Sequence, residues 1–156
     1  MNEENTLGII PNVQSGLFGS KAYNLIITNN GIIVAQFTNK MLKEEAKKSS
    51  QDSKERGDGF LKRIGNQMAS RATFHERYYS MDKDQIINET EGNYFISEPE
   101  IKKIRIKSGQ HFEDGKSTPH QIKIVWNSGK EKFSFTQMTP NEVKKLLQQL
   151  VGKKLK

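Results

Sequence analysis

The sequence predicts a mainly β domain with an α-helical insert, in which seven antiparallel strands form a barrel or sandwich capped by a C-terminal helix. Three observations support this prediction. Apolar and polar residues alternate along several short segments, which is typical of half-buried strands. The run Asn-Asn-Gly at 29–31 separates two β-rich segments and indicates a tight hairpin. The run Thr-Pro-Asn-Glu at 139–142 has the pattern of a capped helix start.

The first β region covers residues 7–38 and predicts strand, glycine loop, strand, turn and strand. Segments 23–28 and 32–38 are rich in β-branched residues, which favour strands. We expect a type I′ turn between them, because Asn-Gly tolerates the positive φ angles that this turn needs at both central residues.

The second β region runs from residue 93 to 137. We expect a tight turn at Ser128-Gly129 to join strands 120–127 and 130–137, and a polar loop over 109–119. Period-two alternation predicts that one face of each strand is buried. The apolar residues that define these strands are Ile101, Ile104, Ile106, Ile122, Ile124, Trp126, Phe133 and Phe135.

Residues 40–90 lie between the two β regions and are helical in pattern. A charged helix with a thin apolar face is expected over 41–54, followed by a break at 57–59 where Asp58 can cap the next helix. A third, short helix should begin at 80–82, with Asp82 and Asp84 in its first turn. The second of these helices should bury Phe60, Leu61, Ile64 and Met68, and the third carries Ile86 and Ile87.

The last element is a helix that begins after Thr139. Its apolar residues recur at i, i+3, i+4 and i+7, so they form one stripe that faces the core. Gly152 ends the helix, and the lysines after it suit the negative end of the helix dipole. The stripe consists of Val143, Leu146, Leu147 and Leu150.

Residues 23–35, with the later segments 101–104, 123–126 and 133–135 and the final helix, resemble small prokaryotic PH-like (GRAM-like) domain proteins. The resemblance implies a single PH-like domain over 1–156 with a helical insert at about 40–90, which the minimal domain lacks. It also implies a binding role. Lipid-binding members hold phosphoinositide head groups on several basic residues between the first two strands. Here that loop has only Lys21, so the lipid site does not carry over.

Composition and the pattern of apolar residues indicate the compartment in which the protein is expected. The chain has no cysteine, which excludes disulfides, thiolate metal sites and cysteine nucleophiles. Its first five residues are acidic and polar, unlike a secretory signal, and its apolar runs are too short to span a bilayer. We therefore expect a cytoplasmic protein without a transmembrane segment.

Charge is uneven along the chain, whose formal net charge is +7. Residues 78–100 hold Lys83 against six acidic side chains, whereas residues 101–138 hold eight basic side chains against three acidic ones. Such a dipolar surface suits an anionic lipid surface, nucleic acid or an acidic protein, although solvated lysines alone would give the same pattern.

The candidate catalytic motifs in the sequence lack a required residue or the required spacing. His75-Glu76 would begin a zinc-protease helix motif, but the position that needs the second histidine is Tyr79. The glycine loop at 16–21 lacks the spacing of a phosphate loop. Metal binding by His111 and His120 is not favoured, because few acidic residues lie near them. We predict no enzyme activity, no catalytic residue, no metal and no cofactor.

Two hypotheses follow. The first is a non-catalytic binding module for a protein partner or for self-association. The alternative is peripheral binding to anionic membranes through lysines 102, 103, 107, 123, 130 and 132, which we expect to be weak because strand alternation should divide them between faces and loops. Nucleic acid is disfavoured because few aromatics lie among the lysines. The candidate contact residues are Leu17, Phe18, Lys21, Lys102, Lys103, Lys153 and Lys154.

Overall fold

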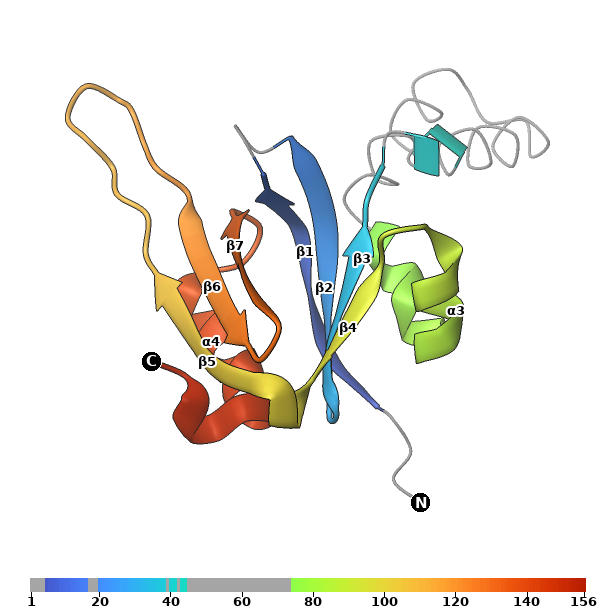
Figure 1. Ribbon diagram of the computed structural model, residues 1–156. Helices are drawn as coiled ribbons and strands as arrows, with labels where there is room; N and C mark the ends of the chain where they lie inside the picture. Colours follow the sequence, from blue (N-terminus) through green and yellow to red (C-terminus); the bar gives the residue numbers. More distant parts are fainter. Residues whose placement is uncertain (1–4, 17–19, 39, 42, 45–73) are drawn as a thin grey trace.

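The structure is a computed structural model, and it describes residues 5–16, 20–38, 40–41, 43–44 and 74–156. It is mainly β with a C-terminal helix (Figure 1). The strands are β1 (Thr6–Ser15), β2 (Lys21–Thr28), β3 (Gly31–Gln36), β4 (Tyr94–Ser97), β5 (Ile101–Lys107), β6 (His120–Trp126) and β7 (Gly129–Phe135). The helices bounded within the described residues are α3 (Lys83–Glu89) and α4 (Pro140–Val151), with 3-10 turns η2 (Phe74–Ser80), η3 (Glu98–Glu100) and η4 (Gly152–Lys154). Residues 40–41 and 43–44 are also helical.

The predicted count of seven antiparallel strands is confirmed, but the predicted closure is not. All seven strands form one sheet in the order β4-β3-β2-β1-β7-β6-β5, so β4 and β5 are its two edges. The η3 turn redirects the chain between them, and its Pro99 has no amide hydrogen to donate to a ladder. The Tyr94 and Trp126 rings, with centroids 6.1 Å apart, bridge the two halves instead.

β1 joins the two halves of the sheet and bends to do so. It pairs with β2 along most of its length and with β7 at Gln14↔Ser134. Its register shifts between Ile10 and Val13, where Asn12 has φ 52° and donates its backbone N–H to Asn24 Oδ1 at 3.1 Å. The shift is a β-bulge, which bends a strand and increases its twist.

The inner face of the bent sheet holds the main core, which α4 completes by packing against β1, β2 and β5. The predicted capping box is confirmed, because Thr139 Oγ1 accepts from Glu142 N and Glu142 Oε1 accepts from Thr139 N, both at 3.1 Å. Leu150 is only partly buried. The helix residues in the core are Val143, Leu146, Leu147 and Val151.

A second apolar cluster covers the outer face of β1, β2 and β3, where η2 and α3 pack (Figure 1). The predicted third helix is confirmed as α3, whose N-cap Asp82 accepts from Gln85 N at 2.8 Å. β2 is therefore buried on both faces. The second predicted helix, with Asp58 and the expected stripe, and most of the first lie outside the described residues. The cluster consists of Ile9, Ile26, Ile33, Ala35, Phe74, Tyr78 and Ile86.

The predicted hairpin between β2 and β3 is confirmed, but its predicted turn type is wrong. Neither Asn29 nor Asn30 has a positive φ. Instead, Thr28 Oγ1 accepts from Asn30 N at 3.2 Å and from Gly31 N at 3.1 Å. A Cβ at Gly31 would lie 2.2 Å from the backbone oxygen of Ile96, so glycine permits the close approach of β4.

The segment predicted as a polar loop is a hairpin arm that continues β5 and β6 beyond the sheet (Figure 1). Thr118 N donates to Gln110 O and Phe112 N to Lys116 O, each at 2.8 Å. At its base, Gly109 N donates to His120 Nδ1 at 2.8 Å, so this imidazole has a structural role. Phe112 lies at the tip and is 49% exposed.

We predict that Leu147→Ala lowers the free energy of unfolding by about 2–5 kcal/mol, as for buried leucines in other cores. Leu147 is 1% exposed and lies between α4 and the sheet. The exposed Gln148→Ala is the control on the same helix. Thermal or urea unfolding measures both, and equal effects would contradict the inward orientation of this stripe.

The second prediction concerns alkaline pH. Burial, followed by the charge of Glu89, raises the pKa of Tyr78 from its usual value of 10.0 to about 12. The unfolded chain releases this proton at lower pH than the folded chain, so the free energy of unfolding should fall as pH rises from 10 through 12. We expect Tyr78→Phe to flatten this fall by roughly 2 kcal/mol, whereas Tyr79→Phe, at an exposed position, should leave it unchanged. Urea unfolding across this pH range measures both, and equal slopes would contradict the assignment.

Candidate functional site: a basic sheet face

The register of β5, β6 and β7 gathers cations on one side of the sheet. Arg105 lies opposite Lys123, which in turn lies opposite Lys132. Residues paired directly across an antiparallel ladder point to the same face, with Cβ atoms about 4.5–5.5 Å apart. This row therefore places three positive side chains side by side across three strands.

The adjacent positions extend the row into a patch. We define the basic face as the nine outward residues of these three strands, six of which are cationic and none of which is acidic. With strands about 4.8 Å apart and a rise of about 3.3 Å per residue, the six cations lie within roughly 10 by 13 Å. The nine residues are Lys103, Arg105, Lys107, Gln121, Lys123, Val125, Lys130, Lys132 and Ser134.

Among the described residues, no acidic side chain forms an ion pair with the cations of this face. The six cationic side chains are exposed. A shallow hollow of about 330 Å³ is lined by Lys123, Lys130 and Lys132 together with Glu131, whose carboxylate accepts a hydrogen bond from Ser15. Like charges held this close repel one another, so an anion placed on the face would relieve the repulsion.

The one acidic residue of β7 points to the other side of the sheet. Glu131 pairs with Ile124, a core residue, and its carboxylate accepts a hydrogen bond from the Ser15 hydroxyl. Burial, and then the negative charge of Glu131, raise the pKa of Tyr94. The pairing with Ile124 and the hydrogen bond from Ser15 place the carboxylate on the inner side of the sheet.

The five predicted contact residues that the structure describes are divided among different elements. Leu17 and Phe18 lie outside the described residues. Lys21 is exposed at the start of β2, and Lys102 lies in a register shift of β5. Lys103 is the one predicted residue that belongs to the basic face. Lys153 is exposed next to α4, and Lys154 donates to Glu98 Oε1 at 2.6 Å.

The expectation that strand alternation divides the lysines is wrong for five of the six. Lys103, Lys107, Lys123, Lys130 and Lys132 share the basic face, together with Arg105, which was not among the predicted contact residues. The sequence contains the information needed to find this face, because the position of the β6–β7 turn determines which residues pair across the hairpin. Two-residue turns pair residues symmetrically, and a turn at 127–128 places 123 opposite 132.

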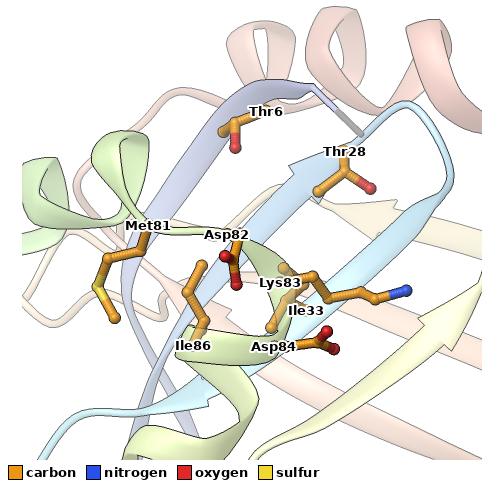
Figure 2. Close-up of a pocket in the computed structure, with 8 residues that line it drawn as sticks. All are labelled: Thr6, Thr28, Ile33, Met81, Asp82, Lys83, Asp84 and Ile86. Carbon is orange, nitrogen blue, oxygen red and sulfur yellow. The ribbon is translucent and has the colours of Figure 1, made fainter. Parts of the chain in front are cut away.

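A different hollow, of about 440 Å³, lies between the ends of β1 and β2 and the first turn of α3 (Figure 2). Its charged groups have structural roles, because Asp82 caps α3 and Lys83 Nζ lies 4.5 Å from the centre of the Phe95 ring. A further hollow of about 620 Å³ includes the Arg77–Glu89 ion pair, at 2.5 Å. Unlike the basic face, both hollows are lined by acidic side chains, Asp82 and Asp84 in the first and Glu44, Glu89 and Glu91 in the second.

The described part of the chain contains no group of three or more histidine, aspartate or glutamate side chains arranged to hold a metal ion. None of its helices is both long enough and apolar enough to cross a bilayer. No protein-family model, curated protein or solved structure matches the chain.

We predict that Lys123→Glu stabilises the fold at low salt. The substitution replaces two like-charge cross-strand contacts by two opposite-charge ones, worth about 0.5–2 kcal/mol together. The gain should shrink in high salt, which screens exposed charges. Urea unfolding at two salt concentrations measures it.

Lys21→Glu makes the same charge change at a position paired with Ser15, where no cation lies directly opposite. A gain as large for Lys21→Glu as for Lys123→Glu would show that net charge, and not the row across β5, β6 and β7, determines the effect.

Proposed function

We propose that this protein is a non-catalytic binding module that attaches to anionic membrane surfaces through the basic face. The observation that carries the proposal is the register that aligns Arg105, Lys123 and Lys132 across three strands. A sheet face with exposed cations and no carboxylate is complementary to a planar array of negative head groups.

The magnitude of the attraction is moderate. Each lysine or arginine near an anionic membrane contributes about 1 kcal/mol, so six give at most about 6 kcal/mol. The patch is about as wide as the screening length of roughly 8 Å at physiological salt, so the cations act on one area of membrane. The expected binding is micromolar or weaker and strongly dependent on salt.

Selectivity among head groups should be low. Five of the six cations are lysines, which act as point charges and lack the paired donors of arginine. The loop between β1 and β2, residues 16–20, has no basic residue, and Lys21 follows it as the first residue of β2. The face also presents no aromatic side chain on which nucleic-acid bases could stack, so membrane is favoured over single-stranded nucleic acid.

The proposal includes a PH-like fold and a cytoplasmic location. Seven sequential antiparallel strands and a C-terminal helix packed in the core agree with the fold that the sequence resembles. The failed spacing at His75 and in the glycine loop supports binding over catalysis. A protein partner is the second candidate function, and the exposed edge of β5 favours it.

The test is sedimentation with vesicles of phosphatidylcholine alone or mixed with phosphatidylserine. We expect binding only to the anionic vesicles. The variant Arg105→Gln/Lys123→Gln/Lys132→Gln should bind about 100-fold more weakly, because three contacts of about 1 kcal/mol each are lost. The matched control Lys144→Gln/Lys145→Gln/Lys153→Gln changes net charge equally at exposed positions on and after α4.

Two results would overturn the proposal. One is an equal loss of binding in both triple variants, which would assign attraction to net charge alone. The other is tighter binding to duplex DNA than to anionic vesicles at equal phosphate concentration. A strong preference for one phosphoinositide isomer at matched vesicle charge, lost in Lys21→Ala, would instead place the site at the loop between β1 and β2.

A further inference from the structure

The C-terminal tail lies along the outer edge of β5 (Figure 1). Leu155 forms a parallel bridge with Ile104, and Lys156 N donates to Ile104 O at 2.8 Å. Lys154 Nζ anchors the tail by donating to Glu98 O at 2.9 Å and to Glu98 Oε1 at 2.6 Å. The β5 edge therefore accepts an extended chain that runs parallel to it.

More of this edge faces outward than the tail covers. The Ile104 carbonyl points away from β6, and backbone groups repeat their direction every second residue, so the groups of Ile106 point to the same edge. β5 is the last strand in the sheet order. In the described part of the chain, the bridge at Ile104 is the one isolated backbone bridge on β5.

The side chains of β5 specify what a docked strand must carry. Toward the core the edge presents Ile104 and Ile106, and toward the basic face it presents Lys103, Arg105 and Lys107. A strand added here alternates its side chains between the same two faces. A second copy of β5 would place its own cations beside these three, so charge disfavours self-pairing.

We propose that the β5 edge binds an extended protein segment in which apolar and acidic side chains alternate, and that residues 154–156 are a built-in competitor for part of this edge. Apolar residues of the ligand extend the inner core, and its carboxylates lie beside the cations of β5. This site goes beyond membrane attachment, because it requires a free backbone edge and not only the basic face.

Fluorescence anisotropy with the whole chain and a short labelled peptide of alternating valine and glutamate tests the proposal. A second peptide has the same composition with all valines preceding all glutamates. A third has the alternating sequence with N-methyl groups on every second residue, which block backbone pairing and keep the charge. We expect the alternating peptide to bind at least about tenfold more tightly than either, because only it makes edge hydrogen bonds in register. Equal binding of all three would overturn the site.

The tail is tested with Lys154→Met, which removes its anchor to Glu98, and with Glu98→Gln, which removes the carboxylate partner. Both should raise the apparent affinity for the alternating peptide about threefold or more, because the edge is open in a larger fraction of molecules. Lys153→Met makes the same charge change as Lys154→Met at an exposed residue and should have no effect.

Unchanged affinity in Lys154→Met and Glu98→Gln would overturn the role of the tail as a competitor. Vesicle binding should be the same in Lys154→Met as in Lys153→Met, which has the same net charge, and Glu98→Gln should differ from the unsubstituted chain only by the effect of one added positive charge. The peptide result therefore does not depend on whether the membrane proposal succeeds.

Discussion

β1 has to change direction within its own length, because it pairs with β2 on one side and with β7 on the other. The register shift at Asn12 allows the change, and the side-chain oxygen of Asn24 on the neighbouring strand holds it. This bend folds a single sheet back on itself, so that its inner face becomes the interior of the protein. The position of α4 depends on the same bend, because the helix contacts β1, β2 and β5 together.

The two halves of the folded sheet are buried to different extents. On β1, β2 and β3 both faces are covered, the inner one by the main core and the outer one by η2 and α3. On β5, β6 and β7 the inner face alone belongs to the core, and the outer face is exposed. β2 accordingly is buried at six consecutive positions, from Tyr23 to Thr28, whereas β6 alternates buried residues with more exposed ones such as Lys123.

Local signals in the sequence predicted the elements that local physics determines. The alternation around Ile122 and Phe133 correctly predicted strands, and the capping box at Thr139 correctly predicted the start of α4. Contacts between residues far apart in the sequence determine features that these local patterns did not predict, such as the need for glycine at position 31. Thr28 organises the β2–β3 turn with its hydroxyl, and Gly31 is needed because β4 approaches it closely. That approach involves residue 96, which no local pattern at 29–31 can indicate.

The basic face was missed because the three strands were not aligned with one another. Placing the β6–β7 turn at 128–129 would pair Lys123 with Ser134 instead of Lys132, but it would leave Lys123, Lys130 and Lys132 on one face, because the pairing shifts by two residues. The cations themselves were visible in the sequence, but their shared location depends on register, which requires three strands to be aligned at once. Of the predicted barrel or sandwich, the seven antiparallel strands are confirmed but closure into a barrel is not, because closure depends on how η3 directs β5 relative to β4.

Trp126 is the single tryptophan of the chain, and it belongs to the end of β6, facing Tyr94 of β4 across the line where the sheet does not close. Its indole therefore serves as an intrinsic optical reporter for this seam. Excitation of Tyr94 can pass to the indole at this separation, and the emission wavelength depends on the water around the ring. A change in how the two halves sit against each other would alter the emission spectrum, with no label attached, while the strands themselves remain intact.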